Sequence, residues 1–168
     1  MFDISHIHPM IVHFPIALLI FGFLADLISV VFKKSFFGKA GLYLLIFGTL
    51  GVIAAYVSGN IAGDGLTEAG PLKNAIEFHQ SAALISLWIM VLTSFVRIGF
   101  IMIKKYEGAF KWVALLLFFA GVLSIARTGY YGGELVFKHA AGVQFNLGNS
   151  LNSNELENNS GSTENKAE

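Results

Sequence analysis

The chain has 168 residues, of which 55% are hydrophobic and only 13% are charged, and its mean hydropathy is +0.66. Soluble domains carry about 25% charged residues, so this composition indicates a membrane protein. Basic and acidic residues balance at zero net charge, which leaves no basic surface for nucleic acid. The absence of cysteine excludes disulfides, thiolate metal sites, covalent haem attachment and cysteine nucleophiles, so histidine and carboxylate remain as candidate ligands.

Four apolar runs follow one another along the chain, at residues 9–32, 38–62, 76–103 and 110–128. Each is near or above the length of about 18 to 20 residues that a membrane-spanning helix needs. Backbone polar groups in lipid must find their partners within the segment, so we expect each run to be a helix. The sequence therefore predicts an all-α fold, a four-helix transmembrane bundle formed by residues 1–145.

The first run opens with HPMIVHFPIALLIFGFLADL, which places His8 and His13 in its first turns and His6 just before it. The lead-in MFDIS has no basic region, so we interpret the run as an uncleaved helix rather than a signal peptide. An unpaired imidazole is costly in an apolar segment, which makes His13 a candidate ligand or proton-handling group. His8 precedes Pro9, so a capping role competes with ligation there. His6 is expected to be solvated.

Two charges lie inside the apolar runs and are expected to form a pair. Asp26 lies seven residues before Lys33, and Arg97 lies seven residues before Lys104, on helices that run in the same direction. The two charges should therefore lie at similar depth. An ion pair would offset an insertion cost of about 2.5 to 3.5 kcal/mol for each charge. A structural clamp is the preferred interpretation, and a proton path is the alternative.

The polar breaks between the runs predict the topology. The first and third breaks, KKSFFGK and KKYEG, are rich in lysine, whereas the second, GDGLTEAGPLKN, has one lysine against Asp64 and Glu68. By the positive-inside rule the first and third loops are cytoplasmic, so both termini are expected to be extracytoplasmic. All five histidines then fall on the outer side: His6, His8, His13, His79 and His139.

The end of the fourth run is rich in glycine. We expect Gly129, Gly132 and Gly133 to break this helix, which leaves Arg127 about one turn from its end. His139 follows the break and is a further candidate ligand along the interface. Residues 146–168 are rich in asparagine, serine and glutamate, and this composition predicts a disordered polar tail.

Imidazoles from facing helices can hold a haem iron or a transition-metal ion. Along the sequence His13 lies 20 residues from Lys33, His8 lies 25 residues from Lys33, and His79 lies 25 residues from Lys104. The difference of five residues corresponds to about 7 Å along a helix. Either helix tilt absorbs this difference, or His8 is the better partner of His79. Both pairings stay open. In the haem case, the propionates are expected to reach toward Arg127, Lys73 or Lys138.

The chain resembles a family of bacterial membrane proteins, domain of unknown function 2231, in four segments. These are HPMIVHFPIALLIFGFLADL, AAYVSGNIAGDG, the segment around His79, and GYYGGELVFKHAAGVQ. The resemblance covers residues 4–144 and implies a four-helix integral domain, expected in the bacterial inner membrane. In longer members this domain looks to be associated with electron-transfer modules such as cytochrome c domains. This chain has Ala140 where we expect glycine from the family pattern. The family pattern carries over onto six positions: His8, His13, Asp26, Asp64, His79 and His139.

The principal hypothesis is a b-type-cytochrome-like subunit that holds haem b on its outer side and exchanges electrons with a quinone or a periplasmic electron carrier. Its axial ligands would be two of four residues: His8, His13, His79 and His139. One alternative places a Cu, Zn or Fe ion on these histidines, with Asp64 or Glu134 completing the shell. Another is a cofactor-free bundle that interacts with lipid and with other membrane-complex subunits. No hydrolase, nucleotide-binding or protease motif is present.

Overall fold

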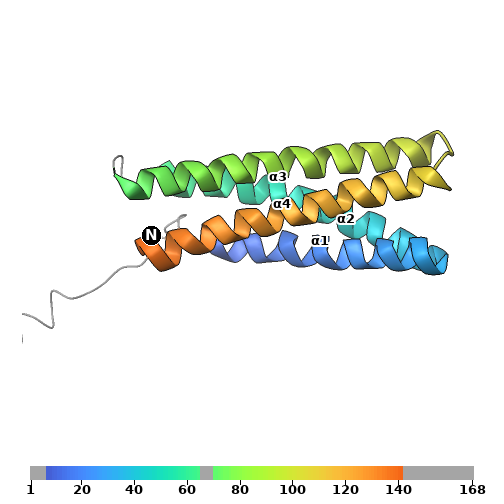
Figure 1. Cartoon of the computed structure of the whole chain (residues 1–168), viewed down its shortest axis with the longest axis horizontal. Helices are drawn as coiled ribbons and strands as arrows, with labels where there is room; N and C mark the ends of the chain where they lie inside the picture. The colour runs from blue at the N-terminus through green and yellow to red at the C-terminus, as the bar shows by residue number, and fades with distance from the viewer. Residues whose placement is uncertain (1–6, 65–69, 142–168) are drawn as a thin grey trace, which may run out of the picture.

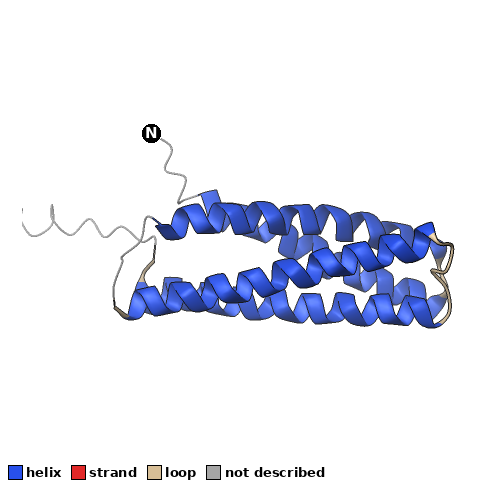
Figure 2. Ribbon diagram, turned by 90° about the horizontal axis from the view of Figure 1, so that it is seen from above, coloured by secondary structure: helices blue, strands red, loops and turns tan. Residues whose placement is uncertain are grey.

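The computed structural model of the chain describes residues 7–64 and 70–141. Four helices follow in chain order: α1 (Ile7–Phe32), α2 (Ser35–Asp64), α3 (Pro71–Met102) and α4 (Ala109–His139). They pack as an elongated antiparallel bundle, joined by short loops where the structure describes the connection (Figures 1 and 2). His6 and the predicted tail at residues 146–168 lie outside the described residues.

All four helices are long and apolar enough to cross a membrane. They contain 26 to 32 residues, which exceeds the length of about 20 residues that spans the hydrocarbon core. Large apolar side chains are exposed along their outer faces, where lipid would cover them, among them Phe21, Phe47, Phe95 and Leu116. The prediction of an all-α bundle of four transmembrane helices is confirmed.

The fourth helix is longer than predicted. It continues through Gly129, Gly132 and Gly133 to His139 instead of ending near Thr128, so the predicted glycine break was wrong. Each glycine costs about 1 kcal/mol relative to alanine in a helix, but an unpaired backbone group in an apolar environment costs more. The helix therefore continues.

The bundle consists of two close helical hairpins, α1 with α2 and α3 with α4. Glycines of α2 allow the close approach to α1, because small residues let helix backbones come together. A Cβ atom on Gly48 would lie 2.5 Å from Leu19 Cγ, and one on Gly51 would lie 2.9 Å from Pro15 Cβ. Side chains of α1 thus fill the space that the missing Cβ atoms leave.

Four fully buried apolar side chains, one from each helix, meet in the middle of the bundle. We call this group the apolar layer; it contains Leu19, Leu45, Met90 and Phe118. Leu19 and Leu45 come from the first hairpin, and Met90 and Phe118 come from the second. The layer therefore joins the two hairpins through apolar packing alone.

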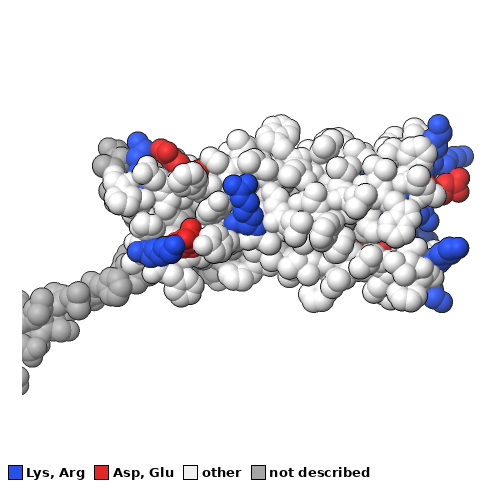
Figure 3. All heavy atoms as spheres, viewed as in Figure 1, with Lys and Arg blue, Asp and Glu red and all other residues white. Residues whose placement is uncertain are grey.

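The two ends of the bundle carry different side chains. The lysine end holds the α1–α2 and α3–α4 loops, with Lys33, Lys34, Lys104 and Lys105. The histidine end holds the starts of α1 and α3 and the ends of α2 and α4, with His8, His79 and His139. In Figure 3 most of the visible Lys and Arg side chains gather at the right-hand end, and uncharged side chains cover most of the middle.

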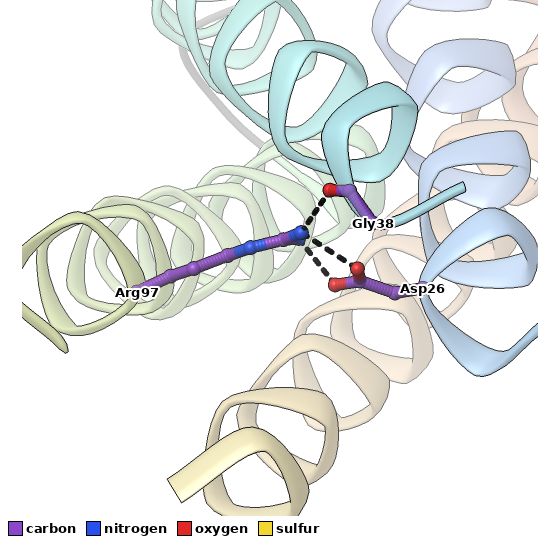
Figure 4. A network of polar contacts seen from close by, with 3 residues as sticks. All are labelled: Asp26, Gly38 and Arg97. Carbon is purple, nitrogen blue, oxygen red and sulfur yellow. Dashed lines mark hydrogen bonds and ion pairs between the residues drawn. The ribbon is translucent and has the colours of Figure 1, made fainter. Parts of the chain in front are cut away.

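Arg97 ties the two hairpins together near the lysine end (Figure 4). It is 1% exposed, and its guanidinium donates to both carboxylate oxygens of Asp26 in α1, with 2.6 Å between Nη2 and Oδ1. The same Nη2 donates to the carbonyl oxygen of Gly38 in α2 at 2.7 Å. The predicted Asp26–Arg97 ion pair is confirmed, and α2 contributes to it as well.

Tyr106, in the loop between α3 and α4, covers this ion pair. The Arg97 guanidinium carbon lies 5.3 Å from the centre of the Tyr106 ring, within the range of a cation–π interaction. Burial raises the pKa of Tyr106 to about 12, and the neighbouring Arg97 charge only partly opposes this rise. The phenol therefore stays neutral and adds no second negative charge beside Arg97.

We expect Gly48→Ala to destabilise the bundle by about 1 to 3 kcal/mol, because the new methyl group overlaps Leu19 and forces α1 and α2 apart. Thermal unfolding in detergent measures the effect. Gly99→Ala is the matched control, since nothing lies within 4 Å of its added Cβ. Equal unfolding temperatures for the two variants would contradict the packing account.

Asp26→Leu leaves the Arg97 charge buried without its carboxylate partner, so we expect a loss of about 3 to 5 kcal/mol. The double variant Asp26→Leu, Arg97→Met removes both charges and should recover most of that loss. Chemical denaturation of the purified variants gives the comparison. A single variant as stable as the double one would show that the pair does not hold the hairpins together.

Candidate cofactor site at the histidine end

Two histidines from opposite hairpins meet inside the histidine end. The ring centres of His8 in α1 and His79 in α3 are 6.4 Å apart, and their planes make an angle of 75°. Both side chains are half-buried. Helices α1 and α3 stand diagonally in the bundle and have no direct backbone contact, so the imidazoles extend toward each other across its interior.

Helix geometry explains why His8 rather than His13 meets His79. His8 lies 18 residues before Asp26, and His79 lies 18 residues before Arg97. Eighteen residues are five turns of about 3.6 residues, so each histidine lies on the same helix face as the charge below it. Since Asp26 faces Arg97, His8 faces His79.

A hydrogen bond to α2 orients the His8 ring. His8 Nδ1 lies 3.0 Å from Ser58 Oγ, and Ser58 Oγ donates its single proton to the carbonyl oxygen of Ala55 at 3.0 Å. Ser58 can therefore only accept from His8, so Nδ1 of His8 carries the proton. In the neutral imidazole this leaves a lone pair on Nε2.

The backbone of α4 orients the His79 ring in the same way. His79 Nδ1 lies 3.1 Å from the carbonyl oxygen of Thr128, which can only accept, so Nδ1 of His79 carries the proton. The Thr128 hydroxyl is in turn 2.9 Å from the Ser86 hydroxyl of α3. His79 thus also keeps a lone pair on Nε2, as a metal-ligating imidazole with a fixed Nδ1 partner does.

Two glycines make room for the imidazoles. A Cβ atom on Gly59 would lie 2.8 Å from Cε1 of His8, and one on Gly132 would lie 3.2 Å from Cε1 of His79. These contacts, and the roles of Ser58 and Thr128, were not predicted from the sequence. Gly59 and Gly132 lie on α2 and α4, which flank the imidazole pair on its two other sides.

The other predicted site residues lie elsewhere. His13 is exposed, and its Nδ1 bonds the carbonyl oxygen of Pro9 in its own helix at 2.6 Å. Arg127 is also exposed and lies over the ring of Tyr131, with 5.4 Å between the guanidinium carbon and the ring centre. The structure therefore does not bring these two residues to the imidazole pair.

His139 is half-buried at the end of α4 and lines a cavity with Glu134 and residues of α3, apart from the pair. Asp64 ends α2, and its side chain lies outside what the structure describes. Within residues 7–63 and 70–141, no group of three or more His, Cys, Asp or Glu side chains is arranged to hold a metal ion.

Four helices of membrane length, with charges at the ends and a lipid-facing apolar surface, define a multi-pass integral membrane protein. A family model described as "Predicted membrane protein (DUF2231)" matches residues 5–145, so the chain belongs to this family. The match confirms the resemblance seen in the sequence. No curated protein and no solved structure matches the chain.

Both imidazoles should carry a proton on Nδ1 in the cofactor-free protein, because their Nδ1 partners only accept. Nitrogen-15 NMR of histidine-labelled protein at pH 8 distinguishes a protonated Nδ1 from a protonated Nε2. Ser58→Ala should perturb the His8 signals and leave those of His79 in place. Protonated Nε2 signals for either residue would refute the assigned orientation.

Proposed function

We propose that this membrane protein binds a b-type haem between His8 and His79 and acts as an electron-transfer subunit. In this proposal the histidine end faces outward, since the lysine loops are expected in the cytoplasm. Its redox partner is a quinone or a periplasmic electron carrier. The observation that carries the proposal is the pair of imidazoles from α1 and α3, each with a free Nε2 lone pair.

The spacing of the two rings supports a haem iron over a tetrahedral ion. A metal–imidazole bond of about 2.0 to 2.1 Å puts the metal about 3.2 Å from the ring centre. Two imidazoles on opposite sides of one ion then have centres about 6.3 Å apart, against about 5 Å at a tetrahedral angle. The 6.4 Å between the ring centres of His8 and His79 is closer to the first of these separations, so the two residues would hold a haem iron if haem binds here.

The surrounding residues support the same assignment. Ser58 and the Thr128 carbonyl hold the two Nδ1 protons, which fixes the tautomer that a ligating imidazole needs. Gly59 and Gly132 let the two rings lie close against α2 and α4. Bound haem would supply a one-electron redox couple, and the chain would supply its axial ligands and an apolar environment.

A bare Cu, Zn or Fe ion remains the alternative for the same histidines, since neutral imidazole suits all three metals. Such an ion needs further ligands, and the described side chains bring only two imidazoles together here. This shortage of protein ligands favours haem, because the porphyrin supplies the remaining four donors.

Protein purified from haem-replete cells should show a Soret band and a pyridine haemochrome of haem b. His8→Ala and His79→Ala should each lower the haem content at least tenfold, because each removes one axial ligand. His13→Ala is the matched control and should keep the haem, since its ring is exposed and bonded within α1.

Elemental analysis of the same samples separates haem from a bare ion. A colourless wild-type preparation would overturn the haem proposal. A metal content that depends on His8 and His79, without a haemochrome, would instead support the bare-ion alternative.

A further inference from the structure

A cavity of about 300 Å³ lies between the first turns of α3 and the last turns of α4, at the histidine end. Two near-parallel aromatic rings border it, Phe78 and Tyr131, with ring centres 6.4 Å apart and planes 24° from each other. Three hydrogen-bonding side chains also line it: Asn74, Glu134 and His139. The cavity thus combines aromatic walls with polar side chains that can form hydrogen bonds.

The charge around the cavity favours a neutral ligand. Glu134 is the acid in its wall, and the Lys138 ammonium and the Tyr130 hydroxyl both donate to its Oε1. The carboxylate disfavours an anion, and its pairing with Lys138 leaves little attraction for a cation. The Asn74 amide and His139 imidazole can still bond the oxygens of an uncharged ring.

We propose that this cavity binds the ring of a membrane quinone. Ligand pockets range from about 300 to 1,000 Å³, so the volume suits a single substituted ring rather than a larger cofactor. Phe78 and Tyr131 would pack against the planar ring, while Asn74 and His139 bond its carbonyl oxygens. A long isoprenoid tail would extend into the lipid beside α3 and α4.

The cavity adjoins the proposed haem site, and its redox meaning rests on the proposed function. Phe78 directly precedes His79, and Tyr131 directly precedes Gly132, which lies against the His79 ring. A quinone in the cavity would therefore lie beside the segments of α3 and α4 that hold His79. Of the two expected redox partners, the quinone is therefore the one that we place between α3 and α4.

Photolabelling of the full chain in lipid nanodiscs with an azido-ubiquinone tests the proposal, with decylubiquinone as competitor. Label should appear within residues 71–78 and 131–139, and the competitor should suppress it at least tenfold. Ala75→Phe fills the cavity and should reduce labelling at least tenfold. Ala126→Phe adds the same side chain to the exposed face of α4 and should leave labelling unchanged.

His139→Gln provides a milder second variant, which should weaken competition by decylubiquinone several-fold without altering the fold. Three results would each overturn the proposal. They are label in other segments, label that the competitor does not displace, and equal labelling of the Ala75→Phe and Ala126→Phe variants. Absorption spectra of the same samples report the haem independently. Haem without quinone labelling refutes this site alone, and specific labelling without haem refutes the proposed function alone.

Discussion

The arrangement of the bundle depends on the buried contact of Arg97 with Asp26 and the Gly38 carbonyl. Helices α1 and α3 have no close backbone contact, so this side-chain contact fixes the level of one against the other. The guanidinium does this with directional hydrogen bonds, which apolar packing does not provide. The equal spacing of 18 residues then transmits this register along both helices to His8 and His79.

The energetics of such a contact favour specificity over stability. Burying two charges costs several kcal/mol for each ion, and their attraction only offsets this cost when the geometry is good. The bidentate contact and the Gly38 carbonyl meet that requirement for three of the five guanidinium protons, while Nε has no partner among the described residues. Tyr106 closes the site with a neutral aromatic face.

Much of the fold could be predicted because lipid restricts the choices. The length and hydropathy of the apolar runs were enough to predict the four helices. The Asp26–Arg97 pair was predicted because Asp26 is as far from Lys33 as Arg97 is from Lys104. The same counting left both His8 and His13 open as partners of His79, because helix tilt could absorb the difference in distance. Adding the helical period does decide it, because 18 residues return each side chain to the same face.

Other features could not be predicted because they depend on the neighbouring helix. Gly132 resembles a helix breaker in the sequence, whereas in the bundle its missing Cβ admits the His79 ring. Likewise, Ser58 and the Thr128 carbonyl have no motif that marks them as partners of an imidazole. Their roles follow only from the packing of α1 on α2 and of α3 on α4.

The described hydroxyl side chains in the interior of the bundle form two separate hydrogen-bonded groups. The hydroxyls of Ser86, Ser124 and Thr128 form one group, Thr49 and Ser94 form another, and no side-chain hydrogen bond of the described bundle joins them. Met90 of the apolar layer lies between Ser86 and Ser94 on α3, so apolar packing separates the two groups along that helix. The described side chains therefore offer no continuous hydrogen-bonded path along which a proton could hop from one end of the bundle to the other.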